Sequence, residues 1–338
     1  MKQTVVTINP LMDFDYSSFY IYGLIKLFGK KNIRFVKSTF KFANTFGALS
    51  FIIQQGDTTT KYVISYNDSY EINEEYYKWC DVYGSVNANI KLTPEKYHKK
   101  LVSLAPSYSI NEWNVMELSY LTFKNFWKVY GLVNPRKYIG RYKKVLINTS
   151  AYKEFINENI KTKDNYIFHL SSLWYNDEWN KNDEGVNLAR ANFIRACKSI
   201  KELEFDGGLL PENKSSIDTF KDCLYHKRLS MNEWILRTKR STMVFNTPAF
   251  WNCHGWKLGQ YLSMGKAIIS TSLSNDLPAP LVHGQNIHLV ENNEAEIKKA
   301  IMMLLKKHEY RKKLEEGAKN YWEEYGTPQK SLALLGIK

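Results

Sequence analysis

Apolar residues in the first half of the chain fall into short runs separated by polar turns, which predicts strands linked by helices and loops. The first predicted strand is 4–9, and 17–29 has the spacing of an amphipathic helix with a serine cap and a glycine stop. Further strands are predicted at 33–38, 48–54, 61–67, 81–87, 101–106 and 143–148, and helices at 74–79 and 116–130.

The second half alternates more regularly between the two kinds of element. Strands are predicted at 166–172, 202–208, 243–247, 267–271 and 286–290, and helices at 184–200, 232–241, 255–264, 293–307 and about 309–323. This alternation predicts parallel sheets with right-handed crossovers. The pair Gly207–Gly208 is interpreted as a turn.

A chain of 338 residues suits two α/β domains better than one. The polar stretch 157–165 is the predicted boundary, which gives an N-terminal domain over 1–160 and a C-terminal domain over 161–324. The last residues, 325–338, are expected to pack back on the N-terminal domain.

Composition indicates a folded protein, because 44% of residues are hydrophobic and 14% aromatic. No apolar run approaches the roughly 20 residues that a membrane helix needs. The N-terminus lacks the apolar region of a signal peptide, so we expect a cytoplasmic protein. The four cysteines show no CxxC pair, which favours buried thiols over a zinc site: Cys80, Cys197, Cys223 and Cys253.

The formal net charge of +13 favours anionic partners. Nucleic acid, an anionic membrane surface and phosphorylated small substrates each fit that charge. The basic residues are spread along the chain and no nucleic-acid-binding signature accompanies them. The charge therefore favours sugar nucleotides and peripheral contact with the inner face of a membrane, and a nucleic-acid binder remains a third hypothesis.

The stretch 245–271 contains polar and basic residues at the start of a predicted helix, where they could bind an anion. The predicted helix at 255–264 follows a strand, and its first turn offers backbone N–H groups and a partial positive charge to a diphosphate. Gly255 allows close approach, Lys257 adds a charge, and His254 and Gln260 add hydrogen-bonding groups. The alternative is that Trp256 and its apolar neighbours face the core while Lys257 is a solvated surface charge.

Three segments of the second half resemble segments of a known protein family. "FIRACKSIKELEFDGG" (193–208), "GQYLSMGKAIIST" (259–271) and "VHGQNIHLV" (282–290) resemble the C-terminal half of the GT-B glycosyltransferases that assemble surface polysaccharides. The resemblance implies two doubly wound, Rossmann-like α/β domains facing a central cleft. It also implies that the C-terminal domain binds the donor, a nucleotide-diphosphate sugar.

The sequence departs from this family at two positions. The retaining members carry two glutamates eight positions apart, and these fall on Asn252 and Gln260. An amide can hydrogen-bond a hydroxyl but supplies no negative charge to a cationic sugar. The stereochemical outcome therefore stays open, and a catalytically inactive module that binds a sugar nucleotide or a partner is the alternative function.

Other donor-site candidates follow from position. The resemblance implies a basic residue near the end of the first strand of the C-terminal domain, and Arg190 is the candidate, with Arg195 and the stretch 226–228 as rivals. Glu291, just beyond the last strand, is the candidate for binding ribose, and Trp256 is included with the donor-binding residues.

A base for the acceptor hydroxyl is expected in the N-terminal domain if the reaction inverts the sugar. Asp13, Asp15 and Asp68 are the candidates, and Asp81 is a weaker one. Each can instead be a capping or turn residue. Asp13-Phe14-Asp15 has a metal-chelating form, but it follows the first strand, where the metal-dependent transferases do not place it.

The resemblance and the residues together thus predict a glycosyltransferase without a metal or other cofactor. No HExxH pattern supports a metal site, and no GxGxxG follows the first strand as in a dinucleotide oxidoreductase. The expected acceptor is a glycan or a lipid-linked sugar.

Overall fold

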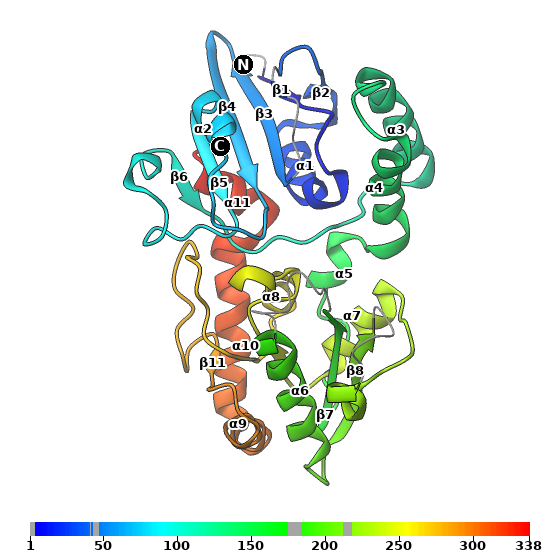
Figure 1. Ribbon diagram of the computed structural model, residues 1–338, viewed down its shortest axis with the longest axis vertical. Helices are drawn as coiled ribbons and strands as arrows, with labels where there is room; N and C mark the ends of the chain where they lie inside the picture. Colours follow the sequence, from blue (N-terminus) through cyan, green and yellow to red (C-terminus); the bar gives the residue numbers. More distant parts are fainter. Residues whose placement is uncertain (1–3, 41, 43–46, 175–183, 212–217) are drawn as a thin grey trace. The chain divides into compact units, whose positions relative to one another are not determined.

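The computed structural model describes residues 4–40, 42, 47–174, 184–211 and 218–338 (Figure 1). The chain forms two compact units. Unit 1 comprises Met1–Tyr152, Asn275–Pro280 and Glu323–Lys338, and unit 2 comprises Lys153–Ser274 and Leu281–Trp322. Both units combine helices with sheets, which confirms the predicted α/β class.

Unit 1 is built on a six-stranded sheet with the order β2-β1-β3-β4-β5-β6. Its strands are β1 (Thr4–Ile8), β2 (Ile33–Phe35), β3 (Ala48–Gln55), β4 (Thr58–Ser65), β5 (Val82–Ser85) and β6 (Leu101–Ser103). Buried side chains such as Val6, Leu49 and Val63 line the sheet. The segment Asn275–Pro280 joins this unit through Asp276, whose backbone N–H donates to the Ala88 carbonyl at 2.7 Å.

The sheet of unit 1 is mixed, where the strand–helix alternation predicted parallel pairing. β3 runs antiparallel to both β1 and β4, while the other pairs are parallel. The reason is a hairpin: two residues, Gly56 and Asp57, connect β3 to β4, and Gly56 has a φ of 61°. A two-residue loop joins only antiparallel strands, and glycine followed by aspartate is one of its sequence signals.

The helices of unit 1 are α1 (Phe14–Phe28), α2 (Glu74–Trp79), α3 (Val115–Val129), α4 (Pro135–Asn148) and α11 (Pro328–Leu334). α11 packs on α1, where an added Cβ on Gly23 would lie 2.8 Å from the Pro328 carbonyl oxygen. Short 3-10 turns cover Lys30–Asn32 and Glu95–Tyr97.

The predicted strand at 143–148 is wrong, because these residues form the last turns of α4. The helix begins at Asn134, whose side chain accepts a hydrogen bond from the Lys137 backbone N–H, with Pro135 in the first turn. Asparagine followed by proline is a strong helix start. Tyr138, Tyr142 and Val145 then recur at helical spacing on the buried face.

Unit 2 contains two small parallel sheets. β7 (Tyr166–Leu173) pairs with β8 (Glu204–Pro211), and β9 (Val244–Asn246) pairs with β10 (Ile268–Ser270), which pairs with β11 (His288–Leu289). Gly207–Gly208 lies within β8 and not in the predicted turn. Both glycines have positive φ, and Gly207 passes close to the His169 carbonyl of β7.

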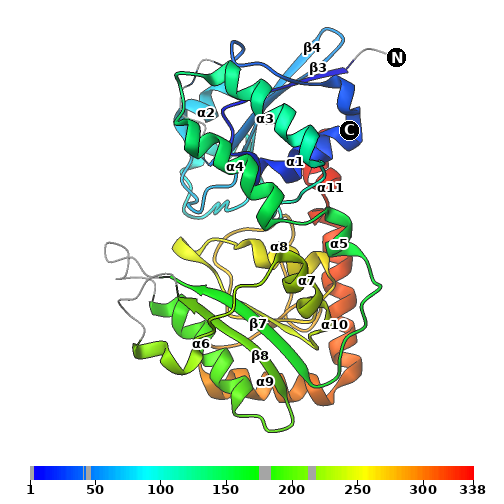
Figure 2. The ribbon, with the colours of Figure 1, turned by 90° about the vertical axis from the view of Figure 1, so that its right-hand side faces the viewer.

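The helices of unit 2 are α5 (Tyr152–Ile156), α6 (Glu184–Lys198), α7 (Met231–Arg240), α8 (Trp256–Ser263), α9 (Glu294–Lys306) and α10 (His308–Tyr321). Of these, α6 contacts both β7 and β8, and α7 contacts β7. Figure 2 shows α6 and α9 on one side of the two strands and α7 and α8 on the other. The core includes Ile167, Phe193 and Phe245, and 3-10 or π turns cover Asp218–Cys223, Phe250–Asn252 and Trp322–Gly326.

Candidate functional site

The two sheets of unit 2 meet along β7 and β9. The backbone N–H of Thr242, just before β9, donates to the Tyr166 carbonyl of β7 at 2.7 Å. From β7 the chain continues to β8 on one side, whereas β9, β10 and β11 follow on the other. This is a topological switch point, and ligands of open α/β sheets bind beyond the carboxyl ends of the strands at such a point.

Lys257 reaches this point from the first turn of α8. Its Nζ donates to the Leu170 carbonyl oxygen and to the Ser171 Oγ, the latter at 2.6 Å, and both acceptors are near the carboxyl end of β7. Burial of the ammonium, together with the charge of Arg190, holds the pKa of Lys257 well below its usual range. The lysine is therefore not a solvated surface charge, because its charged end faces inward although part of its stem is exposed.

Arg190 approaches the same strand end from α6. Its Nη1 donates to the Ser172 carbonyl oxygen at 2.8 Å, one residue beyond the contact that Lys257 makes. The arginine is buried, and its charge lowers the pKa of Lys257 and of His169. Two basic side chains from two helices thus converge on Leu170–Ser172. We call this group, together with His169, the basic cluster.

His169 completes the basic cluster within β7 itself. Its Nε2 lies 3.0 Å from the Ser171 Oγ, and its ring contacts Phe193 and Phe245. Burial, Lys257 and Arg190 lower the pKa of His169 well below its usual range, so the imidazole is neutral at neutral pH. Within the described part of the chain, its Nδ1 has no hydrogen-bond partner.

The start of α8 carries the remaining predicted donor residues. Gly255 is the N-cap in an extended conformation, and no side chain among the described residues caps this helix. His254 and Gln260 are buried, Trp256 is half-buried, and Asn252 is exposed. The predicted residues 252–260 are therefore close along the chain, but their side chains differ widely in exposure.

The turn before α8 has an unusual backbone. Trp251 and Asn252 both have left-handed φ values, 51° and 60°. Asparagine adopts this conformation readily, whereas a bulky residue such as tryptophan does so at a cost of order 1–3 kcal/mol. Backbone strain of this kind clusters at binding sites, and this turn leads directly into the helix start at Gly255.

Glu291 lies in a different part of unit 2. It lines a cavity of about 410 Å³ next to β11 and α9, together with Ser272, His283 and His288. No contact that the structure records joins Glu291 to Lys257, Arg190 or His169 in the described residues.

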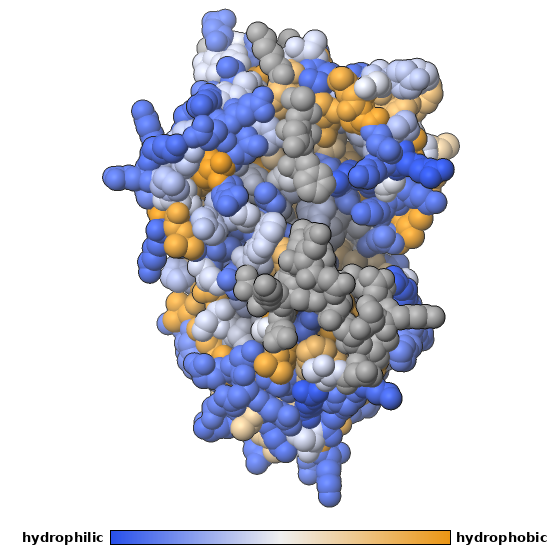
Figure 3. All heavy atoms as spheres, in the orientation of Figure 1, coloured by the Kyte–Doolittle hydropathy of each residue, from blue (hydrophilic) through white to orange (hydrophobic). Residues whose placement is uncertain are grey.

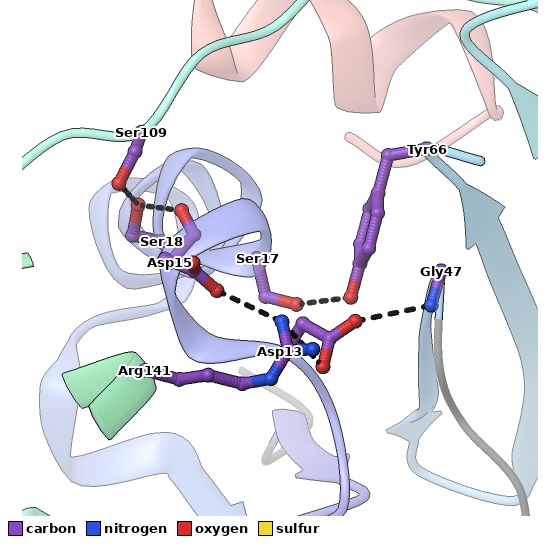
Figure 4. A network of polar contacts seen from close by, with 8 residues as sticks. All are labelled: Asp13, Asp15, Ser17, Ser18, Gly47, Tyr66, Ser109 and Arg141. Atoms are coloured by element: carbon purple, nitrogen blue, oxygen red, sulfur yellow. Dashed lines mark hydrogen bonds and ion pairs between the residues drawn. The ribbon is translucent and has the colours of Figure 1, made fainter. Parts of the chain in front are cut away.

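Unit 1 brings Asp13 and Asp15 together at the start of α1 (Figure 4). The Arg141 Nη1 lies 2.7 Å from Asp13 Oδ1 and 3.3 Å from Asp15 Oδ1. The backbone N–H of Gly47 donates to Asp13 Oδ2 at 3.1 Å. Burial outweighs these contacts and raises the pKa of Asp13 to about 6. Asp13 therefore titrates close to neutral pH.

The other acidic candidates of unit 1 are exposed. Asp68 follows β4, and its charge contributes to raising the pKa of Tyr16 to about 12, after the larger effect of burial. Asp81 accepts a hydrogen bond from the Lys61 backbone N–H at 2.8 Å. That contact ties Asp81, which precedes β5, to β4, as expected of a turn residue.

Three residues of these groups were missed by the sequence analysis. His169 and Ser171 lie in "YIFHLSS", where polar residues near the carboxyl end of an apolar strand are a usable signal. Arg141 had no local signal, because it contacts Asp13 and Asp15 more than 120 positions away, through the packing of α4 against α1.

The described residues form neither a metal site nor a membrane-spanning helix. Among the residues it describes, no group of three or more His, Cys, Asp or Glu side chains could hold a metal ion. In the same part of the chain, no helix combines the length and the apolar character required to cross a bilayer.

Comparisons with known proteins give matches only among solved structures. No family model matches the chain, and no curated protein does. The matching structures include a glycosyltransferase from Rickettsia africae, with 13% identity, a TM-score of 0.41, and coverage of 78% of this chain and 66% of that one. The S. aureus MnaA structure with UDP has 14% identity, a TM-score of 0.39, and coverage of 76% and 67%.

A third match covers only one part of this chain. It is the C-terminal domain of a group 1 glycosyl transferase from Francisella tularensis, with 15% identity, a TM-score of 0.35, and coverage of 51% of this chain and 90% of that one. All three likenesses are distant, so the interpretation of the basic cluster rests on the residues of unit 2 themselves.

Proposed function

We propose that unit 2 binds the diphosphate of a nucleotide sugar at the basic cluster and the start of α8. We further propose that the protein transfers the sugar to a glycan or a lipid-linked acceptor in surface polysaccharide assembly. The GT-B resemblance of 193–208, 259–271 and 282–290 supports the reaction class, and the geometry of unit 2 supports the kind of ligand.

The single observation that carries the proposal is the state of the Lys257 ammonium. It is held by a carbonyl and a hydroxyl, and among the described residues no carboxylate forms an ion pair with it. In its charged form this side chain has three N–H donors, of which two are used, so one is left for a ligand. A buried cation of this kind costs free energy, and a bound anion offsets that cost.

The chemistry follows from the leaving group. When the bond between sugar and diphosphate breaks, negative charge grows on the departing diphosphate. Fixed N–H donors at the start of α8 and the cations at 257 and 190 stabilise this charge without needing to reorganise. The proposed reaction therefore uses no metal, and the protein contributes the electrostatics through its own residues.

On the acceptor side we propose Asp13 as the general base if the sugar is inverted. A base is most effective when its pKa is near the working pH, and the pKa of Asp13 is raised to about 6. Arg141 and Gly47 fix the orientation of its carboxylate. Asp15 shares Arg141, and the exposed Asp68 remains the weaker alternative.

The inactive binding module remains the second candidate. Its support is the pair of amides, Asn252 and Gln260, at the positions where the retaining enzymes carry glutamates. Both candidates share the diphosphate site and differ in turnover, so binding and turnover need separate measurements.

Binding is tested by calorimetry with UDP and with GDP. We expect Lys257→Met to weaken binding by about 1.5–3 kcal/mol, the range for a hydrogen bond to a charged group. Lys306→Met on α9 removes an equal charge from an exposed position and should leave the dissociation constant unchanged. Equal affinity of wild type and Lys257→Met would exclude the basic cluster as the diphosphate site.

Turnover is tested by incubating the protein with a panel of nucleotide sugars and measuring release of the nucleoside diphosphate. A transferase is expected to hydrolyse its own donor slowly even without an acceptor, and Lys257→Met should slow this release. Binding with no release from any donor, with or without glycan and lipid-linked acceptors, would favour the inactive module.

A further inference from the structure

One face of α3 exposes large apolar side chains to solvent. Met116, Tyr120, Phe123, Trp127 and Tyr130 have exposed fractions between 58% and 80%. They are spaced three or four positions apart, so they follow one line along the helix. We call these five residues the aromatic stripe. A soluble surface rarely gathers so many large apolar side chains along one line.

The aromatic stripe is not the buried side of α3. A different face, with Leu118, Asn125 and Val129, is buried, and α3 packs on α4. Asn125 donates a hydrogen bond to the Tyr142 hydroxyl at 3.2 Å, which fixes how the helix is rotated about its axis. The packing of unit 1 therefore holds the aromatic stripe outward.

The surroundings of the aromatic stripe are strongly basic. Residues 115–148, which span α3 and α4, contain one acid, Glu117, and seven basic residues: Lys124, Lys128, Arg136, Lys137, Arg141, Lys143 and Lys144. Glu117 is paired with Lys30 at 2.7 Å, and only Arg141 among the seven contacts carboxylates in the described residues. The two helices thus present a net positive face around the aromatic rings.

A groove of about 700 Å³ continues this surface between α1, β2 and α3. Its lining includes the apolar side chains of Ile21, Ile25, Ile33, Phe35 and Leu121, and the basic side chains of Lys30, Arg34, Lys37, Lys124 and Lys128. In Figure 3, hydrophobic and hydrophilic atoms interleave over the region that α3 and α4 occupy in Figure 1. This one surface therefore offers apolar side chains that can contact hydrocarbon and basic side chains that can contact anionic groups.

We propose that this face of unit 1 docks on the surface of an anionic lipid bilayer. Aromatic side chains settle at the level of the lipid headgroups, while lysine and arginine side chains contact the negative charges there. The groove beside α3 receives lipid hydrocarbon. An anionic bilayer supplies negative charge and hydrocarbon at once. The aliphatic lining of the groove, which includes Ile21, Ile25 and Ile33, favours hydrocarbon over the stacked bases and phosphates that a nucleic acid offers.

A second copy of the chain is the less favoured occupant on grounds of charge. A two-fold interface brings the same patch of both copies together, so the basic residues of 115–148 would face one another. The like charges would repel across such an interface. The bilayer proposal does not depend on the donor site, because the surface belongs to unit 1 and the basic cluster to unit 2.

The test is co-sedimentation of the full chain with vesicles. We expect binding to phosphatidylcholine vesicles that contain about one third phosphatidylglycerol, weak binding to pure phosphatidylcholine, and a decrease with added salt. The double variant Phe123→Ser, Trp127→Ser should reduce binding at least tenfold. The matched control Ile156→Ser, Leu236→Ser changes two exposed apolar residues of unit 2 and should bind as wild type does.

A charge-reversal pair separates the two contributions. Lys124→Glu with Lys143→Glu should also reduce binding at least tenfold, whereas Lys306→Glu with Lys307→Glu should change it far less. All four variants change exposed residues, and circular dichroism and a thermal melt verify folding. UDP binding by the stripe variants should equal that of wild type, so this proposal can fail without the donor site failing.

Three outcomes would overturn the proposal. The first is no binding of wild type to anionic vesicles, and the second is equal binding of the stripe variants and the control. The third is a dimer in light scattering that dissociates in Phe123→Ser, Trp127→Ser, since this would assign the face to a second copy.

Discussion

At the scale of single residues, the protonation of Lys257 links the structure of unit 2 to its proposed ligand. Burial and Arg190 lower the pKa of this lysine in the folded protein. A diphosphate placed beside the ammonium favours the charged form and moves the pKa back up. Ligand binding and proton binding at this side chain should therefore be coupled.

We predict that diphosphate binding takes up protons. Calorimetry of UDP binding at pH 8, in two buffers with different ionisation enthalpies, should show net proton uptake by wild type. Lys257→Met, which has no titrating group there, should show less. Identical enthalpies in both buffers for wild type would mean that the lysine does not change protonation on binding.

Asp13 gives the corresponding prediction for unit 1. A carboxyl group whose folded pKa is raised from 3.8 to about 6 stabilises the fold fully below pH 3.8, and this contribution is lost as the pH rises towards 6. A shift of about two pKa units corresponds to roughly 3 kcal/mol. Asn at this position does not titrate.

Denaturant unfolding of wild type and Asp13→Asn at pH 4 and pH 7 measures this effect. The stability of wild type relative to the variant should fall by roughly 2.4 kcal/mol between the two values, because at pH 4 the unfolded carboxyl is already more than half ionised. If Asp13 is also the general base, Asp13→Asn should reduce the transfer rate by about 10²–10⁴-fold. A stability difference that does not change with pH would contradict the raised pKa.

At the scale of elements, the pairing of β7 with β8 requires a close contact between their backbones at Gly207. Gly207 has a φ of 115°, and an added Cβ would lie 1.9 Å from the His169 carbonyl oxygen. No side chain fits there without separating the two strands. His169 and its neighbour Ser171 belong to the basic cluster, so strand packing and site geometry share this contact.

We predict that Gly207→Ala destabilises the protein by about 3 kcal/mol or more, through backbone strain and steric overlap. Gly185→Ala is the control, because its Cβ would enter open space near the start of α6. Thermal unfolding compares the two variants. Equal melting temperatures for both would show that β8 can move away from β7 without cost.

The elements also show which parts of the fold are predictable from sequence. The helix expected at 255–264 is α8 at Trp256–Ser263, because a glycine start and apolar residues at helical spacing are local signals. The strand predicted at 143–148 was wrong because a short apolar run is compatible with either a strand or a helix. The helix start at Asn134–Pro135 was overlooked. Apolar spacing and a glycine start were enough to predict α8, whereas predicting α4 also required its Asn-Pro start to be recognised.

In the candidate site, too, features local in the sequence were predictable and contacts between distant residues were not. Gly255 and Lys257 were singled out because they lie together at one helix start. The direction of the Lys257 ammonium, towards Ser171 of β7, was not predictable, since the two residues are 86 positions apart. Contacts of this range depend on how strands and helices pack, which a single sequence pattern does not specify.

At the scale of the whole molecule, basic residues behind the net charge of +13 form two groups with different proposed roles. Lys257, whose ammonium faces inward, and the buried Arg190 belong to the proposed diphosphate site of unit 2. The basic residues of α3 and α4 surround the aromatic stripe of unit 1. By our two proposals, basic residues bind a small anionic ligand in unit 2 and a lipid surface in unit 1.

The placement of α11 on α1 bears on synthesis. Unit 2 needs no residue beyond Trp322, whereas unit 1 needs Glu323–Lys338. During translation the later unit therefore has its full set of residues before the earlier one does. Until α11 emerges from the ribosome, the surface of α1 around Gly23 stays uncovered, so this nascent intermediate exposes a patch that a chaperone can bind.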